Sequence, residues 1–189
     1  MIKVKTSRFG EIEVDEKDVI TMPAGIIGFP ELKKYVIMDH ALADDQKESP
    51  FKWLQSLDDG AIAFVLINPL LFKPDYVVEV PEAEVSDLTL ESEENAVISV
   101  IVTMPSNPQN MTANLKAPLI FNLKNRHGKQ IILSNSAYTT RHNIMEEVKK
   151  RTQEAAATQA QEAIQTAASS VEKQTQTAQV ANAGKGKKK

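Results

Sequence analysis

The sequence has no cysteine, and aromatic residues make up only 5% of its 189 residues. Without cysteine the chain forms no disulfide, holds no metal through thiolates and uses no cysteine nucleophile. Long apolar runs are also missing. The longest stretch that is both uncharged and mostly apolar, residues 60–71, is interrupted by Asn68-Pro69 and is shorter than the roughly 20 residues that span a bilayer. The N-terminal residues alternate charged and apolar side chains, unlike a signal peptide. We therefore expect a soluble, cytoplasmic protein that does not enter the membrane.

Motifs that carry catalytic or metal chemistry are scarce. None of the three histidines lies three or four residues from another, so no helical histidine pair for zinc is present. Gly128-Lys129 resembles the end of a phosphate-binding loop, but Gln130 stands where serine or threonine is required. The glycine-flanked serine of a nucleophile elbow is absent as well. The sequence predicts no catalytic residues, no cofactor and no metal.

Charge is distributed unevenly along the chain. Residues 1–99 carry 20 acidic and 9 basic side chains, whereas residues 100–140 carry four basic side chains and no acidic one. The densest acidic stretch, residues 75–94, contains no lysine or arginine. Such a stretch repels phosphates and attracts basic surfaces. It is either a solvated acidic face or a docking patch for a basic partner.

Short strand signals dominate the first 140 residues. Alternation of apolar and charged side chains predicts a hairpin from residues 2–5 and 11–14. Asp58-Asp59-Gly60 predicts a turn between strands at 51–57 and 61–67. Further strands are predicted at 19–22, 35–38, 76–80, 96–103, 115–122 and 129–133. The pattern is typical of an antiparallel sandwich or a closed barrel.

Helical signals before residue 140 are minor. Asn68-Pro69 predicts a single turn that ends near residue 72. Residues 81–88 begin with proline and carry acidic residues in their first turn, which predicts a short helix.

The composition changes after about residue 140. Residues 144–154 are predicted to be helical, because Ile144 and Val148 lie four apart and paired acids precede paired bases. Residues 155–183 are mostly alanine, glutamine, threonine and serine, with too few apolar side chains to fold alone. A basic tail follows at 185–189. We predict a β domain at 1–142 and a low-complexity extension at 143–189 that is partly helical or disordered.

One short segment places aromatic residues beside the acidic stretch. In Phe72-Lys73-Pro74-Asp75-Tyr76, two aromatic side chains adjoin the first acid of that stretch. Aromatic anchors with a charged rim are typical of protein–protein hot spots. The same two residues are equally suited to completing the core, and the sequence leaves both interpretations open.

Several segments, taken together, resemble the FliW family of flagellar assembly factors. The matching segments are Gly25-Ile26-Ile27-Gly28-Phe29-Pro30-Glu31, Phe51-Lys52-Trp53-Leu54-Gln55-Ser56, Ile62-Ala63-Phe64, Asn68-Pro69, Phe72-Lys73-Pro74-Asp75-Tyr76, Thr112-Ala113-Asn114-Leu115-Lys116-Ala117-Pro118, Gly128-Lys129-Gln130 and Ser136-Ala137-Tyr138. Their order and spacing across residues 1–140 make the resemblance specific. It ends near His142, so it implies nothing about the extension.

The resemblance implies a small antiparallel β-barrel-like domain with one or two short helices. It further implies a non-enzymatic regulator, monomeric when free, that binds flagellin as a chaperone does. In alternation, it would bind the translational regulator CsrA and antagonise repression of flagellin translation. The candidate partner-binding residues are Phe72, Asp75, Tyr76, Glu79, Glu82 and Glu84.

Two other functions are compatible with the sequence. A small β-barrel that binds a ligand or acts as an enzyme would need a deep pocket, for which Gln55, Asn114 and Gln130 are the polar candidates. A direct RNA-binding protein would use Lys116, Lys124, Arg126 and Lys129 together with the basic tail at 185–189. Four bases without interleaved aromatic residues are few for that role, and we expect no direct contact with nucleic acid.

Overall fold

The structure is a computed structural model that describes residues 1–40, 49–91 and 95–157. The chain divides into two units, residues 1–146 and 147–189. The predictions made for residues 158–183 and for the basic tail lie outside the described residues. Within the described ranges, none of the helices combines the length and the apolar character needed to cross a membrane.

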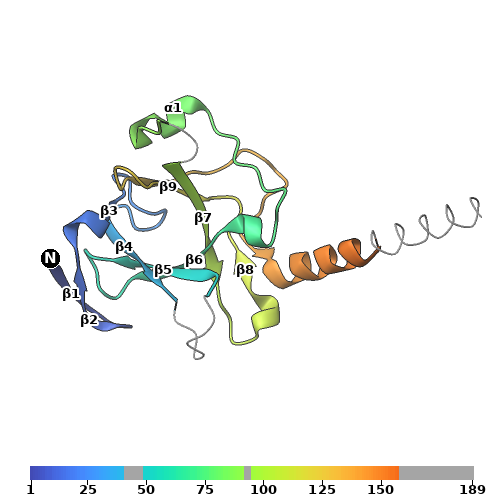
Figure 1. Ribbon diagram of the computed structural model, residues 1–189, viewed down its shortest axis with the longest axis horizontal. Coiled ribbons are helices and arrows are strands. Elements are labelled where there is room, and N and C mark those ends of the chain that lie inside the picture. The colour runs from blue at the N-terminus through green and yellow to red at the C-terminus, as the bar shows by residue number, and fades with distance from the viewer. Residues whose placement is uncertain (41–48, 92–94, 158–189) are drawn as a thin grey trace, which may run out of the picture. The chain divides into compact units, whose positions relative to one another are not determined.

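The first unit is built mainly from short antiparallel strands (Figure 1). The strands are β1 (Ile2–Thr6), β2 (Gly10–Val14), β3 (Ile20–Thr21), β4 (Lys34–Asp39), β5 (Phe51–Ser56), β6 (Ala63–Ile67), β7 (Ala96–Thr103), β8 (Thr112–Ala113), β9 (Leu119–Asn122), β10 (Gly128–Gln130) and β11 (His142–Asn143). The helical elements are η1 (Glu16–Asp18), η2 (Pro69–Leu71), α1 (Glu82–Val85), η3 (Ser86–Leu88) and η5 (Pro108–Asn110). Residues 144–157 are helical as well, which confirms the helix predicted at 144–154.

The strands form two sheets. β1 and β2 pair only with each other, and a nine-stranded sheet runs in the order β10-β9-β7-β6-β5-β4-β3, with β8 between β7 and β11. The two ends of this path meet at a single bridge between Thr21 and His127, where Thr21 N donates to Arg126 O at 2.8 Å. The domain is therefore mainly β and barrel-like, as predicted, but its ladder does not close into a continuous barrel.

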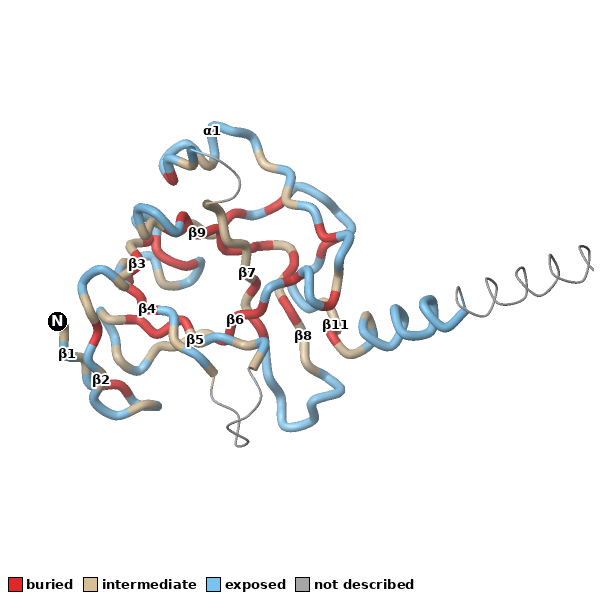
Figure 2. The backbone as a smooth tube through the Cα atoms, in the orientation of Figure 1, coloured by how far each residue is buried: buried red, intermediate tan, exposed pale blue. Residues whose placement is uncertain are grey.

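Three groups of buried side chains form the core, and Figure 2 shows buried residues both on the strands and on the segments between them. One group surrounds Val100 and Leu115 and includes Phe72 and Tyr76. The second surrounds Tyr35, Leu54 and Phe121. A smaller third group consists of Leu88, Ile120 and Ile131. The third group matters most for the candidate site, because it lies under the acidic stretch.

Three strand predictions differ from the structure. Residues 76–80 are extended but join no ladder, since Val77 N donates to the Tyr138 hydroxyl at 2.9 Å. The strand predicted at 115–122 begins only at Leu119, directly after Pro118, which has no N–H to donate. The strand predicted at 129–133 is shorter in the structure, where β10 covers only Gly128–Gln130. The helix predicted at 81–88 is present as α1 followed by η3.

The β1–β2 hairpin is attached to the larger sheet through the β5–β6 turn. Ser7 N donates to Gly60 O at 3.0 Å. Beside this contact, the Phe9 ring meets the Trp53 ring edge to face at 5.5 Å, and the Arg8 guanidinium lies 4.5 Å from the Trp53 ring centre. These contacts fix one end of the hairpin on β5.

Candidate functional site

The acidic stretch packs on the surface of the domain as an amphipathic segment. Its described part runs from Asp75 through an extended segment into α1 and η3, and ends at Glu91. Most of its apolar side chains pack with Ile120 and Ile131, which belong to β9 and to the segment after β10. Those side chains are Val78, Val80, Val85, Leu88 and Leu90. Its carboxylates are consequently left on the outside.

The six predicted partner-binding residues divide into two groups. Asp75, Glu79, Glu82 and Glu84 are exposed. Phe72 is 2% exposed and Tyr76 is 5% exposed. The structure therefore brings four of the six to the surface and places the two aromatic residues in the core, which was the other interpretation of the same segment.

Tyr76 is fixed in the core by its hydroxyl group. The hydroxyl donates to Leu115 O at 2.8 Å, and the ring centre lies 4.7 Å from that of Tyr138. Burial raises the pKa of Tyr76 above its usual value. Since Tyr138 also accepts from Val77 N, the two tyrosines hold the start of the acidic stretch against the domain.

Val77 is the surface residue that the sequence analysis missed. It is 54% exposed and lies between the buried Tyr76 and the exposed Glu79. Together with Glu79, Leu133 and residues 134–136 it lines a shallow hollow of about 340 Å³. The alternation that predicted a strand here did contain the signal, because it places Val77 and Glu79 on the face opposite Tyr76.

Two lysines from the β9–β10 region neutralise part of the acidic stretch. Lys124 Nζ lies 2.6 Å from the Glu91 carboxylate, and this hydrogen bond lowers the pKa of Glu91. Lys129 Nζ lies 3.0 Å from the Asp87 carboxylate and donates to Glu84 O at 2.7 Å. Exposed ion pairs contribute little stability, but these two reduce the charge that a partner would meet.

Asp75 pairs with Lys73 at 3.0 Å, and the remaining acidic side chains form the candidate site. Glu79, Glu82 and Glu84 are exposed and have no ion-pair partner in the part of the chain that the structure describes. Glu82 and Glu84 belong to α1, and Glu79 lies just before Pro81. We call Glu79, Glu82, Glu84 and Val77 the acidic site.

Two asparagines bind the acidic stretch to the turn between β9 and β10. Asn122 is 2% exposed, and its Nδ2 donates to Leu88 O at 2.9 Å and to Thr89 O at 3.2 Å. Asn125 Nδ2 donates to Leu88 O at 3.0 Å. Thr89 and Arg126, one in each connected turn, both adopt a left-handed backbone, with φ of 47° and 58°. Since such residues persist only where the surroundings fix them, the asparagines make this connection rigid.

The four described basic residues predicted for an RNA-binding function do not form an open patch, and the basic tail lies outside the described residues. Lys124 and Lys129 pair with Glu91 and Asp87. Lys116 Nζ donates to Asn135 O at 2.8 Å, and Arg126 lies 3.8 Å from the Asp18 carboxylate. Each base thus contacts a carboxylate or a main-chain oxygen.

The three amide residues predicted for a ligand pocket do not converge on one cavity. Gln55 is fully buried, and its Nε2 donates to Ser56 O and Ile62 O at 2.9 Å. Asn114 accepts from Ala117 N at 3.0 Å, while Gln130 donates to Ala117 O at 3.0 Å. Gln55 therefore supports the β5–β6 turn, and the other two hold the backbone around Ala117.

The family model and the relatives that match this chain carry the same name. A family model described as FliW protein matches residues 3–144. A flagellar assembly factor FliW from Alkaliphilus metalliredigens is 44% identical over 147 residues, which cover 78% of this chain and 88% of that protein. The protein of the same name from Caldanaerobacter subterraneus is 45% identical over 148 residues, covering 78% of this chain and 96% of its own length.

A solved structure supports the same relationship. A crystal structure of the flagellar assembly factor FliW superposes with a TM-score of 0.68 at 37% sequence identity. The superposition covers 75% of this chain and 96% of that one. The fold described above is thus the fold of that protein.

Proposed function

Because this chain belongs to the FliW family, whose relatives are named flagellar assembly factors, we propose that it binds flagellin and CsrA in alternation. It acts in the cytoplasm as a monomer and antagonises the repression of flagellin translation by CsrA. It works by binding alone and performs no chemistry on a substrate.

The acidic site is the observation that carries the CsrA part of this proposal. A translational repressor that binds RNA presents a basic surface, because it must neutralise phosphates. Glu79, Glu82 and Glu84 offer carboxylates that lysines of the chain itself leave unpaired within the described residues. Charge complementarity of this kind raises association rates and selects the partner.

The apolar part of the site is a candidate contact for flagellin. Val77 lies exposed at the hollow that it shares with Glu79. Because Phe72 and Tyr76 are buried, they serve this site by supporting the segment that carries Val77. An amphipathic helix of flagellin would place an apolar side chain on Val77. Overlap of this contact with the acidic site would make the two partners mutually exclusive.

The proposal is tested by reversing the three free charges. A Glu79→Lys, Glu82→Lys, Glu84→Lys variant is titrated with purified CsrA and with purified flagellin at low and high salt. We expect CsrA affinity to fall by at least about tenfold at low salt and by less at high salt, since salt screens exposed charges. Unchanged affinity for CsrA would exclude the acidic site.

A second triple variant provides the matched control. Glu11→Lys, Glu31→Lys and Glu146→Lys change the net charge by the same amount at exposed positions outside the acidic stretch. This variant should retain CsrA affinity within about threefold. An equal loss in both variants would show an effect of net charge alone. Displacement of CsrA by flagellin, measured with the wild type, tests whether the two partners alternate.

A further inference from the structure

Strand β4 has a free edge over more than half of its length. Across Tyr35–Asp39 it pairs with β5 on one side. On the other side it pairs with β3 at only two positions, Tyr35 with Ile20 and Lys34 with Thr21. From Val36 onward, that side of β4 has no neighbouring strand within the described residues.

The helical turn η1 is the cause of this open edge. Continuing the β3–β4 register would place Asp18 opposite Ile37. Instead, Asp18 N donates to Asp15 O at 2.9 Å, and the Asp15 side chain caps the turn by accepting from Lys17 N at 3.2 Å. The chain therefore joins the ladder only at Ile20, and no residue that the structure describes takes the position beside Ile37.

The main-chain groups of Ile37 point into this position. Leu57 N donates to Lys34 O on the β5 side, and Met22 N donates to Lys33 O on the β3 side, both at 2.8 Å. Because neighbouring residues of a strand direct their N–H and C=O groups to opposite sides, Ile37 directs its groups away from β5. In the described part of the chain they bond neither η1 nor the hairpin.

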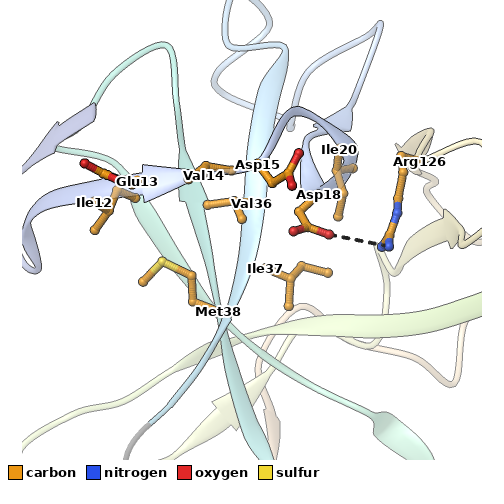
Figure 3. A pocket seen from close by; sticks show the side chains of 10 residues that line it. All are labelled: Ile12, Glu13, Val14, Asp15, Asp18, Ile20, Val36, Ile37, Met38 and Arg126. Atoms are coloured by element: carbon orange, nitrogen blue, oxygen red, sulfur yellow. Dashed lines mark ion pairs between the residues drawn. The ribbon is translucent and has the colours of Figure 1, made fainter. Parts of the chain in front are cut away.

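A groove of about 220 Å³ lies at this edge (Figure 3). Its walls come from the end of β2, from Asp18 and Ile20, and from residues 36–38 of β4. The apolar side chains Ile12, Ile37 and Met38 face it, and Ile37 is 36% exposed. The groove thus combines apolar contact area with unpaired backbone groups, which are the two features that strand addition uses.

The charges of the groove favour a basic occupant. Three carboxylates, those of Glu13, Asp15 and Asp18, line it together with the single guanidinium of Arg126. Arg126 and Asp18 form a loose pair at 3.8 Å, with both side chains more than 40% exposed. Glu13 pairs with Lys3 at 2.7 Å and Asp15 with Lys17 at 3.0 Å, which reduces their charge, but neither lysine lines the groove. A second copy of the chain would bring the same carboxylates and is therefore disfavoured.

We propose that the free edge of β4 binds an extended peptide segment of a partner protein in which apolar and basic side chains alternate. The segment adds as a strand beside Ile37 and exchanges main-chain hydrogen bonds with it. One of its basic side chains replaces Arg126 at Asp18, and its apolar side chains, which share one face of the added strand, contact Met38 on the other face of β4. This surface is distinct from the acidic site and does not depend on the function proposed for it.

The test uses the full chain and a heptapeptide of alternating valine and lysine with blocked ends. Binding is followed by amide chemical shifts and by hydrogen exchange at Ile37. We expect the Ile37 amide to shift and its exchange to slow by at least about tenfold, since its N–H becomes hydrogen-bonded. The same peptide with glutamate in place of lysine should bind at least about tenfold more weakly. Equal binding of both peptides, or shifts confined to the acidic site, would overturn the proposal.

Two variants at one position separate backbone recognition from side-chain contact. Ile37→Pro removes the outward N–H and leaves the bonds to β5 in place, so peptide affinity should fall by about tenfold. Ile37→Ala keeps the N–H and should lose less affinity than Ile37→Pro. If Ile37→Pro disturbs the β4–β5 amides, a peptide N-methylated on alternate residues replaces it and should fail to bind. A dimer that Ile37→Pro abolishes would identify a second copy as the occupant and refute the proposal.

Discussion

The side-chain amide of Asn122 donates a hydrogen bond of 2.9 Å to the main-chain oxygen of Leu88, which lies 34 residues earlier in the sequence. Its oxygen at the same time accepts from Lys124 N at 2.8 Å. One buried side chain therefore shapes the β9–β10 turn and ties the acidic stretch to it. Any partner that binds Glu82 or Glu84 thus meets a surface that is already positioned, which reduces the entropy cost of binding.

Replacing Asn122 should loosen the acidic stretch. Asn122→Ala removes a buried side chain that bonds Leu88 O, Thr89 O and Lys124 N, and we expect a loss of about 2–3 kcal/mol in unfolding free energy. Hydrogen exchange of residues 82–90 should accelerate more than exchange elsewhere. Asn125→Ala removes a less buried partner of Leu88 O and should cost about 1 kcal/mol. Equal effects of the two variants would contradict the role assigned to Asn122.

Substituting Phe72 should lower the unfolding free energy far more than substituting Asp75, although the two residues are only three positions apart. Phe72 is 2% exposed, so Phe72→Ala should lower the unfolding free energy by about 3–5 kcal/mol. Asp75 is exposed, and Asp75→Asn should change it by less than about 1 kcal/mol. Urea unfolding measures both. If Phe72→Ala is as stable as the wild type but no longer binds a partner protein, Phe72 is a surface contact and its assignment to the core is wrong.

The hydroxyl groups of Tyr35 and Tyr76 should affect stability in opposite ways at neutral pH. Tyr76 donates to Leu115 O, so Tyr76→Phe leaves a buried carbonyl without its donor and should cost about 1–2 kcal/mol. The Tyr35 hydroxyl is buried and has no partner among the described residues. Tyr35→Phe should therefore be neutral or stabilise the protein by up to about 1 kcal/mol. Thermal unfolding of both variants at pH 7 checks the difference in sign.

Tyr35 should also contribute to unfolding in alkali. Burial, together with the nearby carboxylates of Asp58 and Glu31, raises the pKa of Tyr35 to about 12. The unfolded chain loses this proton near pH 10. The stability that the protonated hydroxyl contributes is therefore fully present below about pH 10 and is lost as the pH rises toward 12. Between these values Tyr35→Phe should lose less stability than the wild type, and identical pH profiles would contradict the assignment.

Local pattern was enough to predict much of the fold. The hairpin of β1 and β2, the turn at Asp58-Asp59-Gly60 and the short helix after Pro81 all depend on side chains close in sequence, and each is present. The extended residues 76–80 also alternate, but the Tyr138 hydroxyl, 61 residues away from Val77, takes the N–H that a ladder would use. Periodicity alone could not distinguish the two outcomes.

The candidate site was only partly predictable for the same reason. The exposed carboxylates follow from a stretch without lysine or arginine. Their partial neutralisation depends on Lys124 and Lys129, which lie 33 and 42 residues from Glu91 and Asp87. The free edge beside Ile37 depends on where β3 begins, and this is set by the helical turn η1, which Asp15 caps. The ion pairs are tertiary contacts, and although the cap of Asp15 on Lys17 N is local, it does not indicate which strand would lie beside the turn.

Gly60 should tolerate no side chain, because the hairpin lies directly against it. A Cβ at this position would lie 2.0 Å from Lys5 O, a main-chain atom that cannot move aside cheaply. Gly60→Ala should therefore push β1 away, weaken the bond from Ser7 N to Gly60 O, and lower the unfolding free energy by about 2–3 kcal/mol. Urea unfolding gives this energy, and hydrogen exchange of the β1–β2 amides shows whether the hairpin loosens first.

Gly10 provides the matched control for Gly60, since it lies in the same hairpin. Its backbone is left-handed, with φ of 69°, and a Cβ there would meet nothing within 4 Å. Gly10→Ala should thus cost only the conformational strain of about 1–2 kcal/mol, without faster exchange at the Ser7 amide. If Gly60→Ala leaves the Ser7 amide as protected as Gly10→Ala does, the hairpin is not held at Gly60. Its position beside the groove of β4 would then have to depend on Phe9 and Arg8 at Trp53 instead.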